Sequence, residues 1–241
     1  MSVLYTVADG VGTITLNRPE SRNALNLAMC DGLIDAAREA SSNESIKIIF
    51  VKANGPVFCA GADLKERQGM NEAQVRERRM KGFAAYAALE ALPMPAIAVV
   101  QGPAVGSGCE IAAACDFIVA TPQASFRTPE ALRGTVGATQ RLPRILGKRL
   151  AKDMMLTGRT LNAEEAREAG LVSRLVSEAE LEEVLSRIKD EILKAPPQSL
   201  RLAKRCIDQG VELDPQGALA IEIAAIEEQL AGGNWMGKKL P

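Results

Sequence analysis

The sequence predicts an α/β fold, in which one core of strands and helices is followed by a helical region. Strand-like segments alternate with segments of helical periodicity through the first 120 residues, and the pattern after residue 140 is mostly helical. The chain has 241 residues, 47% of them hydrophobic, and can therefore bury a sizeable core. Only 3% are aromatic, so aliphatic side chains must fill this core.

The N-terminal half predicts a hairpin and then alternating helices and strands. Residues 4–7 and 11–16 alternate as strands do, and Asp9-Gly10 between them is a strong hairpin signal. In chain order we then expect a helix over 27–40, a strand over 46–51, a helix over 71–92, a strand over 96–100, a helix from about Cys109 and a strand over 117–120.

The C-terminal half predicts several helices and one more strand. Asn162 and Glu165 fit a capping pair, and Gly170 fits the end of the helix that they begin. A last strand is expected over 171–176, and helices are expected over 177–194, 198–209 and 214–230. We therefore expect a core over residues 1–190 and a C-terminal helical region over 191–241.

The composition excludes several functional classes. The chain has no histidine, which removes Ser-His-Asp and Cys-His nucleophile systems and most zinc sites, and we expect no metal. A formal net charge of −1 provides no field that would attract nucleic acid or an anionic membrane. Five cysteines without CxxC spacing are typical of small buried residues in a reducing compartment, so we expect a cytoplasmic protein.

Three segments could carry chemistry, and each also has an ordinary structural interpretation. In Phe58-Cys59-Ala60-Gly61-Ala62-Asp63, small residues would let a ligand approach the main chain, but a tight loop has the same composition. In the segment 101–110, a glycine-rich turn leads into a helix whose free N–H groups suit a developing oxyanion. There, Ser107 and Glu110 also fit a capping box, which would use Glu110 structurally.

The third segment is Thr128-Pro129-Glu130, which fits a helix start with proline at the first helical position. A carboxylate in a first helical turn ordinarily compensates the helix dipole. Two glutamates together with two amide-bearing turns and no histidine nevertheless favour acid/base chemistry at a polarised carbonyl.

The chain resembles the crotonase superfamily, the enoyl-CoA hydratase/isomerase family. The three segments above and several others occur in the order that this family shows. The matching segments cover about residues 10–210. They are Thr15–Pro19 with Asn23–Asn26, Phe58–Glu66, Gln101–Glu110, Cys115-Asp116, Phe126 with Pro129-Glu130, Thr139–Arg144, Leu156–Gly158, Ala163–Ala166 and Gly170–Val172.

The resemblance implies a crotonase-like spiral of ββα units with a C-terminal helical trimerisation region, assembled as a homotrimer or a dimer of trimers. It implies an oxyanion hole made by the backbone N–H groups of Ala62 and Ser107. It implies no cofactor beyond the coenzyme A (CoA) of the substrate. The residues that it places along the CoA path are Arg22, Ala60, Ala62, Asp63, Leu64 and Lys65.

Within this family the carboxylates decide the reaction. Hydratases carry glutamates at both of the positions where this chain has Glu110 and Glu130, which implies addition of water to a 2,3-unsaturated acyl-CoA. Two segments depart from the family pattern. The turn 134–138 is about three residues short, and the chain stops at Trp235–Pro241, where Lys238 and Lys239 could partly replace contacts to CoA.

Other functions stay open at this point. The same fold and thioester could support isomerisation, decarboxylation or thioester cleavage. From a different class, the chain could be a catalytically weak scaffold or an RNA-binding protein of this fold, although it lacks a basic patch interleaved with aromatic residues.

Overall fold

The computed structural model describes residues 1–232, and its centre is a six-stranded sheet. The strand order is β1-β2-β3-β4-β6-β9, in which β1 and β2 are antiparallel and the other neighbours are parallel. The six strands are β1 (Val3–Ala8), β2 (Val11–Leu16), β3 (Ile48–Ala53), β4 (Ala96–Val100), β6 (Phe117–Ala120) and β9 (Arg174–Leu175).

A second, three-stranded sheet was not predicted, because each of its strands has only three residues. It consists of β5 (Pro103–Val105), β7 (Ser125–Arg127) and β8 (Thr160–Asn162), in the order β5-β7-β8. Strand β5 and the turn after it carry the glycine-rich segment. This sheet therefore positions one of the candidate chemical segments.

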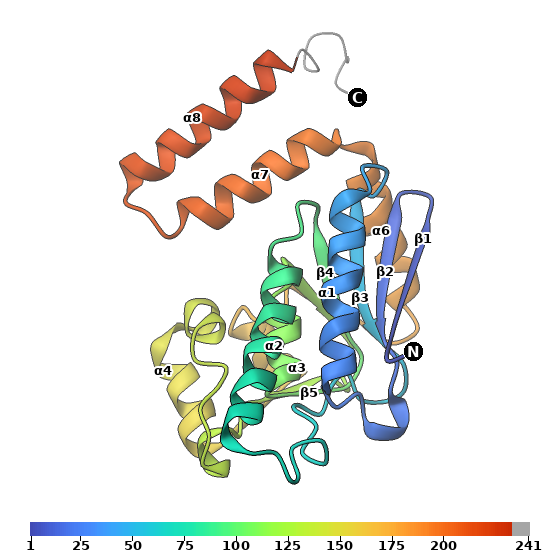
Figure 1. Ribbon diagram of the computed structural model, residues 1–241. Helices are drawn as coiled ribbons and strands as arrows, with labels where there is room; N and C mark the ends of the chain where they lie inside the picture. Colours follow the sequence, from blue (N-terminus) through green and yellow to red (C-terminus); the bar gives the residue numbers. More distant parts are fainter. Residues whose placement is uncertain (233–241) are drawn as a thin grey trace.

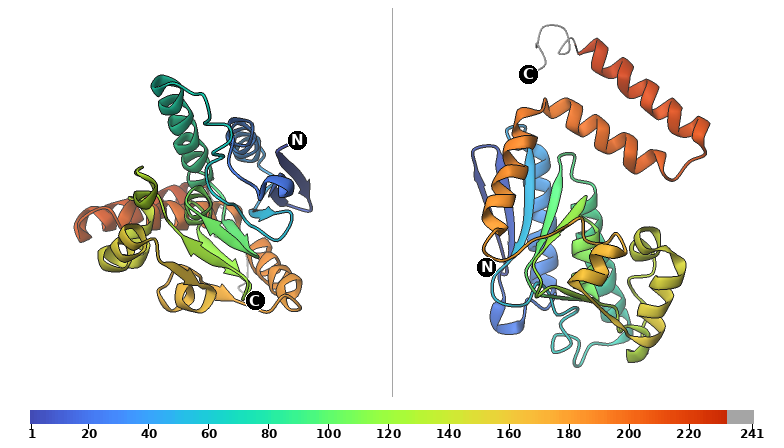
Figure 2. Two further views of the ribbon diagram at one scale, coloured as in Figure 1. Left: turned by 90° about the horizontal axis from the view of Figure 1, so that it is seen from below. Right: turned by 180° about the vertical axis from the view of Figure 1, so that it is seen from behind.

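Helices cover both faces of the large sheet (Figures 1 and 2). Apolar residues of α1 and α2 pack on one face, and those of α6 pack on the other against Ile48, Ile97 and Val119. The helices are α1 (Leu27–Ser42), α2 (Glu72–Glu90), α3 (Ser107–Ala113), α4 (Arg141–Thr157), α5 (Ala163–Glu168), α6 (Leu181–Lys194), α7 (Pro197–Gly210) and α8 (Pro215–Ala231), with short 3₁₀ helices η1 (Pro19–Ser21) and η2 (Ala131–Arg133). Among the described residues, no helix has both the length and the apolar character needed to cross a bilayer.

Helices α7 and α8 form a hairpin that projects beyond one end of the sheet (Figures 1 and 2). The sequence predicted both helices within a few residues of their observed ends. The segment Trp235–Pro241, including Lys238 and Lys239, lies outside the described residues.

Several local predictions are confirmed, and others are corrected. Asp9 and Gly10 both have positive φ, 50° and 77°, as a tight hairpin turn requires. Asn162 and Glu165 form the predicted capping box. The strand predicted over 171–176 is only the two-residue β9, because Leu171 and Val172 instead donate backbone hydrogen bonds to Ala166 O at the end of α5.

Candidate active site

Two glycine-containing turns that are distant in sequence lie side by side. Their backbones are joined by Val105 N–H donating to Cys59 O at 2.9 Å and by Cys59 N–H donating to Pro103 O at 3.2 Å. Glycine is required for this approach, since a Cβ on Gly108 would lie 2.4 Å from Cys59 O. The two candidate segments thus form one local structure.

Ala62 and Ser107 each have a backbone N–H group that is not used within this local structure. Leu25 N–H donates to Gly61 O, and Asp63 N–H donates to Leu25 O, so the N–H of Ala62 between them points away from Leu25. Ser107 is the first residue of α3, where a backbone N–H has no acceptor within the helix. Both residues border the same small cavity of about 100 Å³.

Glu110 lines that cavity from α3 and is 5% exposed. One carboxylate oxygen, Oε2, accepts a hydrogen bond of 2.8 Å from Arg141, while Oε1 is buried and has no hydrogen-bond partner among the described residues. Burial raises the pKa of Glu110, and the adjacent Arg141 guanidinium opposes that rise. The capping box of Ser107 and Glu110 does not form, because α3 begins after Gly106 without a side-chain cap.

Glu130 lines the same cavity. It precedes η2, so the predicted helix start at Thr128-Pro129-Glu130 is instead a single 3₁₀ turn over Ala131–Arg133. Its Oε2 is also buried without a hydrogen-bond partner within residues 1–232. Burial raises the pKa of Glu130, and the charge of Glu110 raises it further. Two glutamates therefore leave one oxygen each available in one cavity.

A larger cavity of about 660 Å³ opens from the turns and shares Ala62 and Glu130 with the small one. Of the residues predicted along a CoA path, Ala60, Ala62 and Leu64 line it. Arg67 and Arg133 also line it, and no motif of the sequence predicted a role for either. Their positive charges make this cavity suitable for an anionic ligand.

The other three residues predicted along that path do not line this cavity. The side chains of Arg22 and Lys65 are exposed. The Asp63 carboxylate is paired with Arg18 at 3.0 Å and accepts hydrogen bonds from the backbone N–H groups of Lys65 and Glu66. Asp63 therefore stabilises the turn that holds Ala62.

Four residues of the short turn 134–138, Thr135 to Ala138, line the small cavity. Arg79 of α2 donates hydrogen bonds to Thr135 Oγ1 and to Val136 O, the latter at 3.0 Å. A mostly apolar recess of about 370 Å³ lies behind Glu130 and the same turn, and its apolar lining includes Val136, Met155 and Leu156. The turn therefore separates two spaces that an acyl chain could occupy.

Buried cysteines surround the site but are poor nucleophiles. Burial raises the pKa of Cys59 to about 12 and also raises the pKa of Cys109. Cys109 Sγ lies 3.0 Å from Ala104 O. Four of the five cysteines are buried as predicted, whereas Cys206 is half-buried. Among residues 1–232, no group of three or more Cys, Asp or Glu side chains is arranged to hold a metal ion.

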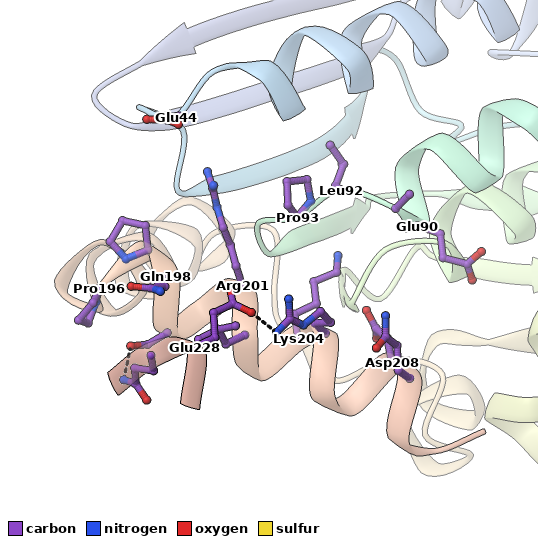
Figure 3. A pocket seen from close by; sticks show the side chains of 17 residues that line it. Glu44, Glu90, Leu92, Pro93, Pro196, Gln198, Arg201, Lys204, Asp208 and Glu228 are labelled. Carbon is purple, nitrogen blue, oxygen red and sulfur yellow. Dashed lines mark hydrogen bonds and ion pairs between the residues drawn. The ribbon is translucent and has the colours of Figure 1, made fainter. Parts of the chain in front are cut away.

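A further cavity lies away from these turns. It is a groove of about 1030 Å³ between α7 and the core, shown in Figure 3. Several of its charged side chains are paired, as in Lys204 with Asp116 at 2.9 Å and Arg205 with Glu228 at 2.6 Å. One of its lining residues, Glu90, also contacts the candidate site through Arg141.

Sequence reasoning did not identify Arg141 as a site residue. It stands within the segment 139–144 that carries part of the family resemblance, which was the available signal. Its contacts to Glu90 and Glu110 join segments that are 51 and 31 residues away, so only the fold reveals them.

Comparisons with known proteins agree on one family. A family model described as enoyl-CoA hydratase/isomerase matches residues 6–232. The mouse protein named enoyl-CoA hydratase domain-containing protein 2, mitochondrial, is 40% identical over 223 residues, which cover 88% of this chain and 75% of that protein. The crystal structure of enoyl-CoA hydratase from Bacillus anthracis has a TM-score of 0.91 at 37% identity, covering 94% of this chain and 90% of that one. A Thermobifida fusca structure in complex with CoA has a TM-score of 0.89 at 26% identity, covering 96% and 93%.

Proposed function

The chain belongs to the enoyl-CoA hydratase/isomerase family, and from this premise we propose that it hydrates 2-enoyl-CoA thioesters. The observation that carries the proposal is the pair of unpartnered oxygens, Glu110 Oε1 and Glu130 Oε2, on one cavity bordered by Ala62 and Ser107. A water molecule needs about two to four polar partners in a buried site. The two unpartnered carboxylate oxygens would supply such partners to a water molecule.

The reaction begins with polarisation of the thioester carbonyl. The carbonyl oxygen accepts hydrogen bonds from Ala62 N–H and Ser107 N–H, which stabilise negative charge as it develops on that oxygen. Removing one such donor typically costs about 3 kcal/mol, or roughly 100-fold in rate. The N–H group at the start of α3 also benefits from the positive end of the backbone dipoles.

Water then adds across the double bond. Glu110 accepts a proton from the water while the water oxygen bonds to C3, and Glu130 delivers a proton to C2, so the net change is addition of one H and one OH. Burial raises the pKa of Glu130, which favours its protonated form and suits the role of proton donor. Glu110, next to Arg141, is better suited to remain a carboxylate and act as the base.

The cavity of about 660 Å³ is the proposed path of the CoA moiety, with Ala60, Ala62 and Leu64 along it. The proposed path also includes Arg22, Asp63 and Lys65, which would contact CoA through their main chain or from the rim of this cavity. The CoA complex of the Thermobifida fusca protein supports this assignment, because the two folds superpose over nearly the whole chain.

We further propose a homotrimer or a dimer of trimers, with the region 191–241 taking part in trimerisation. Supporting it, α7 and α8 carry exposed apolar side chains, including Ile207 at 66% and Leu219 at 55% exposure. Light scattering after size-exclusion chromatography tests the assembly, and a monomer at micromolar concentration contradicts it. A cytoplasmic location stays a prediction.

An ultraviolet assay of enoyl thioester loss over a panel of acyl-CoAs tests the reaction. We expect hydration of at least one 2-enoyl-CoA, and a fall of about 100- to 10,000-fold in kcat for Glu110→Gln and for Glu130→Gln. Glu178→Gln, an exposed change, is the control. If one glutamate suffices and 3-enoyl-CoA is converted instead, the enzyme is an isomerase. Water addition that survives loss of both carboxylates contradicts the mechanism.

A further inference from the structure

Arg141 connects three helices next to Glu110. It is the first residue of α4, and its guanidinium contacts Glu90 at the end of α2, with N–O distances of 3.1 and 2.6 Å. Its third nitrogen donates to Glu110 Oε2 on α3 at 2.8 Å. The guanidinium carbon lies 5.9 Å from the ring centre of Tyr86, also on α2. Arginine presents a planar fork of donors, which suits this bidentate arrangement.

The contact determines which oxygen of Glu110 faces the cavity. Because Oε2 is held by Arg141, the other oxygen, Oε1, is directed away from the guanidinium and has no partner within residues 1–232. The Glu110 side chain is 7% exposed and that of Arg141 is 18% exposed, so solvent screens this pair little. Glu90, in contrast, is 54% exposed at its side chain.

We propose that Arg141 is a positioning residue, which fixes Glu110 Oε2 so that Oε1 faces the reacting water. Glu90 also pairs with Arg141 and so partly neutralises the positive charge that Glu110 experiences. The proposal rests on the proposed hydration, in which Glu110 is the base. Arg141 and Glu90 touch neither the substrate nor the reacting atoms.

The two neighbours act on Glu110 in opposite directions. Burial raises the pKa of Glu110, the positive charge of Arg141 lowers it, and the negative charge of Glu90 raises it. Loss of Arg141 therefore stabilises the protonated, inactive form of Glu110, and loss of the Glu90 charge destabilises it. Arg141 therefore both orients the carboxylate and favours its ionised form.

Other ionisable groups lie near Glu90 and Glu110, and none of them is substituted in the variants compared below. Around Glu90, Lys204 and Asp208 of α7 face the same groove (Figure 3). The ionisable groups that share the small cavity with Glu110 are Glu130, Tyr86, Arg67, Arg78 and Arg79, and Cys109 adjoins Glu110 on α3.

The experiment compares pH profiles of kcat/KM for the full-length wild type, Arg141→Gln and Glu90→Gln. We expect the acidic limb of Arg141→Gln to move to higher pH, with kcat/KM at pH 6 reduced by up to about 100-fold and recovering towards pH 9. We expect the limb of Glu90→Gln to move to lower pH. In both variants KM changes less than kcat. Arg141→Lys, which keeps the charge, should restore most of the wild-type limb.

Arg144→Gln is the matched control, because Arg144 lies one turn further along α4 and pairs with Glu212 where both side chains are more than half exposed. Its profile should equal that of the wild type. A uniform loss of activity in Arg141→Gln, with no movement of the limb, would overturn the proposal, as would movement of both limbs in the same direction. If Arg141→Gln fails to fold, Glu90→Gln tests the proposal by itself. Movement of its acidic limb to lower pH supports the proposal, and movement to higher pH or no movement overturns it.

A second measurement separates this proposal from the proposed function. The carboxyl C=O stretch of Glu110, assigned by its loss in Glu110→Gln, can be followed against pH by difference infrared spectroscopy in the free enzyme. It should titrate at higher pH in Arg141→Gln and at lower pH in Glu90→Gln, whatever reaction is catalysed. Absence of hydration in the wild type refutes the proposed function, whereas unchanged titration of Glu110 refutes the role of Arg141.

Discussion

The carboxylate of Glu130 occupies the space that a side chain at position 106 would need. A Cβ built on Gly106 would lie 2.3 Å from Glu130 Oε1. Gly106 has φ 52°, and it immediately precedes Ser107. The glycine in the turn therefore allows the carboxylate proposed as the proton donor to lie close beside a proposed oxyanion donor.

Gly106→Ala should accordingly impair both stability and catalysis. The backbone of Gly106, with φ 52° and ψ −107°, is one that other residues rarely adopt, at a cost of about 1–3 kcal/mol. The displaced Glu130 should also reduce kcat by about 100-fold or more. Urea unfolding and kcat measure the two effects. Gly170→Ala is the control, because Gly170 has φ 82° with open space around it and should lose stability without loss of kcat.

Glu130→Gln should be more stable than the wild type near neutral pH while losing activity. Burial raises the pKa of Glu130, so the folded protein binds this proton more tightly than the unfolded chain does. The contribution of the wild-type residue to stability is present at low pH and is lost as pH rises through the folded pKa. A gain of about 1 kcal/mol is typical where activity and stability oppose each other.

Urea unfolding of Glu130→Gln and wild type at pH 7.5 and at pH 4 measures this difference, which should shrink at the lower pH. Glu178→Gln should show no such pH-dependent difference, since Glu178 is exposed. A Glu130→Gln protein that is less stable at both pH values contradicts the prediction.

Arg79→Gln should loosen the turn 134–138. Its guanidinium holds Thr135 and Val136, and its charge lowers the pKa of Glu130. Arg79→Gln removes the guanidinium that makes both hydrogen bonds, and each charge-assisted hydrogen bond contributes about 1.5 kcal/mol or more. We expect KM for the acyl-CoA to rise by at least about tenfold and the preference among acyl groups to change. Steady-state kinetics over an acyl-CoA panel measures this. Arg76→Gln, on the exposed side of α2, should leave the panel unchanged.

Asp63→Asn should affect stability more than substrate affinity. Burial raises the pKa of Asp63, but Arg18 and the N–H groups of Glu66 and Lys65 lower it by more. The resulting stabilisation is present above the unfolded-state pKa and is lost as pH falls through the folded pKa. We expect a loss of about 1–2 kcal/mol in urea unfolding at pH 7 and a change in KM of less than about threefold. A large rise in KM with unchanged stability would instead indicate that the Asp63 carboxylate contacts CoA directly.

The sequence predicted the longer elements because their periodicity is local. Strands β4 and β6 have the predicted bounds, and α1, α2, α7 and α8 end within a few residues of prediction. It did not predict β5, β7 or β8, whose stability comes from pairing with one another and not from their own three residues. Nor could it decide whether Glu110 caps α3, because the side chain of Arg141 competes for the same carboxylate from a distant segment.

By itself the sequence determined the α/β class, the helical C-terminal region and, through ordered motifs without any histidine, the family. Only the tertiary structure decided that Glu110 and Glu130 share a cavity and that Arg141 links Glu110 to Glu90. It also decided that Asp63 stabilises the turn beside that cavity. The physical reason is that the periodicity of helices and longer strands is set by residues close together in sequence. The protonation and orientation of a buried carboxylate depend on desolvation and on charges that folding brings from elsewhere in the chain.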